Sequence, residues 1–239
     1  TTLDDFKGAI RVNEFEIEKD KRVYPIENMV FTANYGPGYR KLQLNGDLLD
    51  AQLEGDFLPS LLDKSFNNFL AQLLPNTSSF ERVEIPSQQF DFQLELKQAK
   101  AITALIQPGT WVNAGKVSGK FDSENQVMSV SALFDQVHYG DFEFHDLSMV
   151  ADSSKGDQEF GLHIHCAEIL QKDSSLAHGL GINLNVVKSK VGFAIGGFSD
   201  PYSTELSLQG DFLFSDTSVY TVFQSSYLRV DTLRWNIGE

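Results

Sequence analysis

Apolar and polar residues alternate along most of this chain. Between positions 49 and 57, Leu49, Ala51, Leu53, Gly55 and Phe57 are separated by acidic and amide residues. The same period of two returns at 90–97 and at 160–166. In a β-strand this period places every apolar side chain on one face and every polar side chain on the other. The pattern therefore predicts an all-β protein with one long apolar face.

Short runs rich in Gly, Asn, Asp, Ser and Pro divide the alternating pattern, as turn residues do between strands. Asn45-Gly46-Asp47 and Ser199-Asp200-Pro201 are two examples. The strands predicted between these turns are Lys7–Asn13, Phe15–Lys19, Met29–Ala33, Lys41–Leu44, Leu48–Phe57, Phe90–Leu96, Val117–Phe121, Val127–Phe134, Gln136–Tyr139, Phe142–Met149, Phe160–Cys166, Ile182–Val187, Val191–Ile195, Glu205–Phe214, Thr217–Gln224 and Tyr227–Ile237.

The segment 58–74 departs from this pattern. Its Leu and Phe residues recur at helical spacing, Ser60 and Asp63 form a possible capping box, and Pro75 ends the run. An amphipathic helix is expected from Ser60 to Leu74, either as a cover for the apolar face or as a plug that yields to a ligand. A second, short helix is expected at Gln98–Ile106, before Pro108.

These elements predict one continuous, twisted, mainly antiparallel sheet that curls into an open trough, with the 60–74 helix on its apolar side. Gly8–Ala33 and Gly119–Ala151 share a weak repeat, which suggests an extensible sheet rather than a closed barrel. We interpret residues 1–239 as a single segment of a longer repetitive body. The side chains expected to point into the trough are Leu53, Phe57, Phe92, Leu94, Phe142, Phe144, Leu162, Ile164, Leu184, Phe193 and Leu208.

Composition narrows the classes of partner. The net charge is −14, so a polyanion such as DNA or RNA would be repelled, and docking on an anionic membrane is disfavoured. The chain has 19 Phe but only 2 Trp, which suits a purely apolar surface because Phe has no hydrogen-bonding group. One cysteine, Cys166, rules out an internal disulfide. No run of about 18 apolar residues is present to span a membrane.

The sequence offers little catalytic chemistry. His163 and His165 share a strand face, but a metal site needs a third ligand, and strand parity sends Cys166 to the opposite face. No Gly-x-Ser-x-Gly turn signals a hydrolase nucleophile, and Gly196-Gly197 lacks the Lys-Ser/Thr of a phosphate loop. We therefore expect no catalytic residues, no metal site and no cofactor.

One stretch resembles a known family. Leu42-Gln-Leu-Asn-Gly-Asp-Leu-Leu-Asp-Ala-Gln-Leu-Glu-Gly-Asp-Phe57, followed by the predicted helix that ends before Pro75, is similar to the TamB (AsmA-like) proteins, especially those of the Bacteroidetes type. Gly46 stands where that family commonly has Ser. The tail, from Val219 through Leu233-Arg-Trp-Asn-Ile237, resembles the same family.

This resemblance implies a specific biology. TamB-like proteins have an inner-membrane anchor and a long periplasmic body, a curled sheet called a β-taco. The apolar concave face of that sheet is thought to carry phospholipid acyl chains toward the outer membrane. A TamA-type outer-membrane assembly barrel is the usual partner. The resemblance thus implies a periplasmic, bridge-like lipid-transfer protein.

Two other functions stay open. A scaffold for outer-membrane protein assembly would use free strand edges to pair with an incoming β-strand. A β-sandwich or β-solenoid enzyme or carbohydrate binder is the weakest of the three, because such a site usually presents Trp or Tyr beside carboxylates. What co-purifies with the protein, lipid or unfolded protein, would separate the first two functions.

Overall fold

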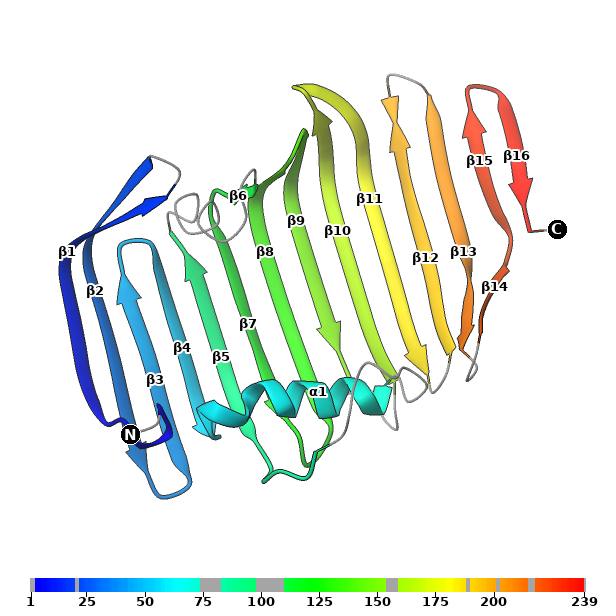
Figure 1. Ribbon diagram of the computed structural model, residues 1–239. Helices are drawn as coiled ribbons and strands as arrows, with labels where there is room; N and C mark the ends of the chain where they lie inside the picture. The colour runs from blue at the N-terminus through cyan, green and yellow to red at the C-terminus, as the bar shows by residue number, and fades with distance from the viewer. Residues whose placement is uncertain are drawn as a thin grey trace.

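The computed structural model describes residues 3–19, 22–73, 83–97, 110–153, 159–187, 190–200, 203–214 and 218–238. All strands in these ranges join one sheet, and every pairing is antiparallel (Figure 1). The expectation of a single, mainly antiparallel, open sheet is confirmed.

Neighbours in the sheet follow chain order almost throughout. The strands are β1 (Gly8–Lys19), β2 (Arg22–Gly36), β3 (Tyr39–Gly46), β4 (Leu49–Asp56), β5 (Gln89–Leu96), β6 (Thr110–Val112), β7 (Gly115–Asp122), β8 (Val127–Tyr139), β9 (Phe142–Asp152), β10 (Glu159–Gln171), β11 (Ser174–Val187), β12 (Lys190–Ser199), β13 (Thr204–Phe214), β14 (Val219–Phe223), β15 (Ser226–Val230) and β16 (Leu233–Ile237). Short β6 pairs with β8, while β14 and β15 pair with opposite ends of β13.

Several strand boundaries differ from the sequence prediction. The two runs on either side of Glu14 form one strand, β1, because Glu14 adopts a φ of 51° without breaking the pairing with β2. The two runs within 127–139 likewise form one strand, β8. The run Tyr227–Ile237 divides into β15 and β16, with Asp231 at φ 51° between them. The alternating pattern does not predict strand β6 or the first half of β11.

The helix α1 spans Leu62–Leu73 and follows a 3-10 turn, η2, at Pro59–Leu61. It lies across the middle strands of the sheet, close to one end of those strands (Figure 1). The predicted capping box is wrong, since the Ser60 hydroxyl donates to Asp4 in the N-terminal 3-10 turn η1 (Leu3–Asp5), at 2.6 Å. The helix expected at Gln98–Ile106 lies outside the described residues.

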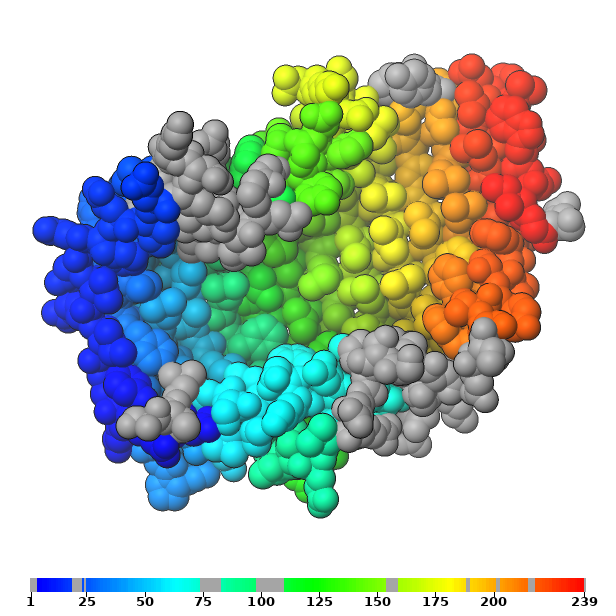
Figure 2. All heavy atoms as spheres, in the orientation of Figure 1, coloured from blue at the N-terminus to red at the C-terminus, as the bar shows by residue number. Residues whose placement is uncertain are grey.

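The core lies between α1 and the sheet. Its buried members are Phe57, Phe69, Leu73, Phe90 and Phe121. Phe69 contacts Phe121 on β7 and Phe160 on β10, with ring centroids 5.9 and 6.3 Å apart, so the helix reaches across several strands. Viewed from this side, the sheet is hollowed, with α1 along one rim (Figure 2).

Candidate functional site: the apolar trough

The face that α1 contacts carries uninterrupted apolar rows across the sheet. Strand register aligns one residue of each neighbouring strand, so a row can be followed from pair to pair. The Phe92 row runs from β1 to β14 through Gly8, Ala33, Leu42, Leu53, Phe92, Gly119, Val130, Ala151, Leu162, Leu184, Phe193, Gly210 and Phe223. We call this face the trough.

A second row runs beside the first, two residues further from α1 along each strand. The Leu94 row runs from β1 to β13 through Ile10, Phe31, Leu44, Ala51, Leu94, Val117, Ala132, Met149, Ile164, Ile182, Ile195 and Leu208. At about 4.8 Å between strands, this row is about 50 Å long. Neither row contains a charged or polar side chain.

The structure brings eight of the eleven predicted trough residues together in these two rows. Leu53, Phe92, Leu162, Leu184 and Phe193 belong to the Phe92 row, as their pairings show. Leu94, Ile164 and Leu208 belong to the Leu94 row. Phe57 lies apart from both, because it follows β4 and is buried in the α1 core at 1% exposure.

Phe142 and Phe144 reach the trough face through a kink in β9. Leu147 pairs with Phe134, which shares the trough face with Ala132, two residues away on β8. Unbroken alternation would then place Phe144 on the opposite face. Instead Asp146, at φ 49°, shifts the alternation by one residue. Both Phe side chains therefore lie on the trough face, as the sequence pattern predicts.

The contacts of His178 show on which face of the sheet His145 and Phe144 lie, beyond the kink in β9. Phe198 shares a face with Ala194, which pairs with Asn183 on the polar side of the sheet. His178 stacks on Phe198 and pairs with Glu168, which in turn pairs with His145. His145 is therefore on the polar face, and its neighbour Phe144 is on the trough face.

Little covers the trough among the described residues. Apart from Phe57 and Phe193, which are buried, the predicted trough residues are all half-buried. Beneath α1, by contrast, Phe90 and Phe121 are 3% and 1% exposed. The helix thus closes one rim, and the apolar rows beside it stay accessible.

Charged groups gather on the opposite face. Lys41–Glu54, Lys116–Glu95 and Lys120–Asp91 form ion pairs there, with N–O distances of 3.0, 3.2 and 3.4 Å. The pairs Lys116–Glu95 and Lys120–Asp91 are largely exposed, so each contributes little to stability. Along the Phe92 and Leu94 rows the sheet thus separates charge from apolar surface across β3 to β7, whereas Arg40, two residues from Leu42 toward α1, is a charged residue on the trough face.

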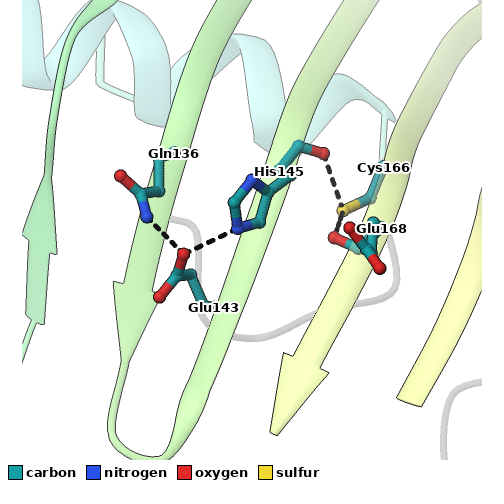
Figure 3. Close-up of polar contacts among 5 residues, drawn as sticks. All are labelled: Gln136, Glu143, His145, Cys166 and Glu168. Carbon is teal, nitrogen blue, oxygen red and sulfur yellow. Dashed lines mark hydrogen bonds and ion pairs between the residues drawn. The ribbon is translucent and has the colours of Figure 1, made fainter. Parts of the chain in front are cut away.

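A hydrogen-bonded group on the polar face joins β8 and β9 (Figure 3). Gln136 and His145 both contact the Glu143 carboxylate, His145 through Nε2 at 2.6 Å. The hydrogen bond from Gln136, followed by that from His145, lowers the pKa of the Glu143 carboxyl group. These contacts join β8 and β9 just beyond the kink. The alternating sequence pattern does not predict them.

The candidate metal ligands do not converge. His163 and His165 are exposed on the polar face, and His163 Nδ1 contacts the Asn183 side chain at 2.5 Å. Cys166 is 1% exposed, and its Sγ donates to the carbonyl oxygens of His145 and Glu168 (Figure 3). Burial raises the pKa of this thiol. No group of three His, Cys, Asp or Glu residues in the described ranges could hold a metal ion.

Comparison with known proteins gives no relative. No protein-family model matches the chain, and neither a curated protein nor a solved structure matches it. Within the described residues, no helix is both long and apolar enough to cross a membrane. The trough must therefore be interpreted from its own geometry.

Proposed function

We propose that the trough binds the acyl chains of phospholipids and that this chain is part of a lipid carrier. The observation that carries the proposal is the pair of apolar rows, about 50 Å long, without a charge. Contiguous apolar surface of this extent on a protein usually marks a binding site.

The energetics favour an acyl chain as the occupant. An acyl chain gains about 0.8 kcal/mol for each CH₂ group that it buries. Half-buried Leu and Ile side chains gain as well when the chain removes their remaining surface from water. The headgroup would stay in water at the open side of the trough, so no polar partner for it is required inside.

The wider assignment rests on the TamB resemblance. Its motif covers β3, β4, η2 and α1, the hairpin and helix that form the rim of the trough. We propose a periplasmic, bridge-like protein with an inner-membrane anchor elsewhere in the full protein. Its partner at the outer membrane would be a TamA-type assembly barrel.

A scaffold for outer-membrane protein assembly is the second candidate. The observation that favours it is the sheet edge at β14 and β16. Every residue of β14 is exposed, and Trp235 on β16 is 49% exposed. Such an edge can pair with an added strand.

The experiment compares Leu94→Arg with Glu95→Arg, neighbours on one strand that point to opposite faces. Fluorescent phospholipid is titrated into the purified protein, and native mass spectrometry records bound lipid. Leu94→Arg places a cation in the middle of the apolar path, where it costs several kcal/mol unless it reaches water. We expect at least tenfold weaker binding for Leu94→Arg and an unchanged affinity for Glu95→Arg.

Circular dichroism is the control for folding, and Leu94→Arg should keep its strand signal because the guanidinium can extend to the open side. Equal loss from both variants would contradict the trough as the binding site. Binding of an unfolded β-barrel protein by both variants, with no lipid bound to either or to the unmodified protein, would favour the scaffold.

A further inference from the structure

The polar face carries a furrow of its own. Three hollows, with volumes of about 640, 430 and 330 Å³, share lining residues and so form one continuous depression. Gln93 and Ser118 line two of them, and Val150 and Asp152 join the third. The furrow crosses the strands on the face opposite the trough.

Amide, hydroxyl and imidazole side chains form the floor of the furrow. Cross-strand pairing aligns Gln52, Gln93, Ser118, Ser131, His163 and Asn183 from β4 to β11, with Val150 in their midst. At about 4.8 Å per strand, this floor is about 30 Å long. Amide and hydroxyl groups both donate and accept hydrogen bonds.

Part of this floor is free to bind. The side chains of Gln93, Ser118 and Ser131 are exposed and make no hydrogen bond to any described residue. Gln52 accepts a hydrogen bond from Gln43 and donates one to Glu54 beside the floor, and His163 contacts Asn183 within it, so these side chains are oriented. A ligand in the furrow would therefore meet consecutive free polar groups from β5 to β8.

Two glycines deepen the furrow, although the backbone conformation at neither position requires a glycine. A Cβ on Gly161 would lie 3.8 Å from the nearest atom, and one on Gly192 would lie 3.4 Å away. Neither glycine has a positive φ. Glycine inside a strand weakens it and often marks a place where a ligand approaches closely. These positions leave open space that a side chain could occupy without strain.

Charge selects among polar ligands. Acidic residues such as Asp91, Asp152 and Asp211 flank the floor, and the whole chain carries −14. A polyanion would be repelled along the length of the furrow. The neighbouring cations Lys120 and Lys190 are paired with Asp91 and Asp211, at 3.4 and 3.0 Å. The ligand should therefore be long, neutral and rich in hydroxyl groups.

We propose that the furrow binds a neutral, linear polysaccharide laid across the strands. One sugar of an extended glycan covers about the spacing between neighbouring strands, about 4.8 Å. Each further sugar then reaches one more floor side chain, and the exposed Val150 offers an apolar contact to a ring face. No Trp or Tyr among the described residues lines these three hollows, so the affinity rests on hydrogen bonds and on chain length.

Affinity gel electrophoresis tests the proposal with hydroxyethylcellulose, a soluble neutral β-glucan, and with anionic carboxymethylcellulose. The protein should be retarded by the first polymer and not by the second. For short β-glucan oligosaccharides, the affinity should rise with length up to about six sugars.

Gly161→Val is the blocking variant, and Gly181→Val is its matched control. Both glycines lie in the polar face, but Gly181 lines none of the three hollows, and a Cβ added to it would have no described atom within 4 Å. Valine favours strands, so both variants should melt at or above the temperature of the unmodified protein. Gly161→Val should weaken binding about tenfold, and Gly181→Val should leave it unchanged.

A second pair of variants removes one polar side chain and adds no volume to the furrow. His163→Ala should weaken binding about fivefold, and His165→Ala, two residues away on the same face, should not. No retardation by hydroxyethylcellulose, equal retardation by both polymers, or equal effects within either pair would overturn the proposal. Lipid binding in the trough is measured separately, so either result stands without the other.

Discussion

At the scale of single residues, glycine and phenylalanine form cross-strand pairs on the trough face. Phe92 pairs with Gly119, Phe193 with Gly210, and Phe134 with Gly115. In the first pair, a Cβ on Gly119 would lie 2.6 Å from the Phe92 ring and 2.2 Å from the Ser129 carbonyl oxygen. The ring thus lies over the glycine and covers backbone that would otherwise face solvent.

Gly119→Ala should destabilise the protein by about 1–3 kcal/mol, because the new methyl group clashes with the Phe92 ring and with the β8 backbone and pushes both away from position 119. Urea unfolding measures the change. Gly181→Ala is the control, and its new methyl group has open space. Since glycine costs about 0.5–1 kcal/mol within a strand, the control should be neutral or stabilising. Similar losses in both variants would contradict the close Phe92–Gly119 contact.

At the scale of elements, α1 is fastened to the sheet at its beginning. The Asp4 carboxylate accepts hydrogen bonds from the backbone N–H of Ser60 at 3.0 Å and from its hydroxyl at 2.6 Å. Nearby, the Gln88 side chain accepts from the Leu58 N–H at 2.6 Å. These bonds connect η1, the residue that precedes β5 and the entry to the helix, and so set where α1 crosses the strands.

Acidification should weaken the bond between Asp4 and Ser60. The side-chain and backbone hydrogen bonds from Ser60 lower the pKa of Asp4 from its ordinary value of 3.8. A carboxyl group with a lowered pKa stabilises the folded state above its unfolded pKa and loses that contribution as the pH falls through its folded pKa. Asp4→Asn should therefore be less stable than the unmodified protein at pH 7, and the difference should shrink toward about pH 3.

Urea unfolding at about pH 7, 5 and 3 follows this difference. Ser60→Ala and the double variant complete a mutant cycle, in which the second change should add little once the first is made. A difference that stays constant across these pH values would mean that the Asp4 carboxylate does not act through this contact.

At the scale of the whole molecule, the two edges of the sheet differ. On β1, Glu14, Glu16 and Glu18 line the edge strand, and charges of this kind discourage pairing with another chain. On β14, Tyr220 and Val222 are 60% and 49% exposed, and no described strand covers the outer side of β14. The sheet therefore has one protected edge and one apolar edge.

Val222→Lys should reduce self-association of the purified protein, because a cation on the apolar edge opposes pairing of strands between molecules. Sedimentation velocity at several concentrations gives the measurement. Leu133→Lys is the control, since Leu133 is similarly exposed, at 58%, but lies on β8, where it pairs with Lys116 on β7 and with Ser148 on β9. If the two variants associate alike, the β14 edge does not mediate contact between molecules.

Local patterning is enough to predict the all-β class, the open sheet and the apolar composition of one face. Alternation is a local property, because each strand residue points away from its neighbour whatever the strand pairs with. It therefore predicts that Phe92 and Leu94 share a strand face, and the structure confirms this. Helical spacing likewise predicts α1 within two residues at each end.

The alignment of the strands and the shifts in their alternation depend instead on the folded chain. Register depends on partners far apart in the sequence, so the apolar rows and the Phe92–Gly119 contact cannot be derived from one strand alone. The kinks at Glu14 and Asp146 interrupt the local pattern, and paired neighbours hold both residues in a left-handed conformation. The Asp4–Ser60 contact and the polar furrow arise for the same reason, since each needs groups that only folding brings together.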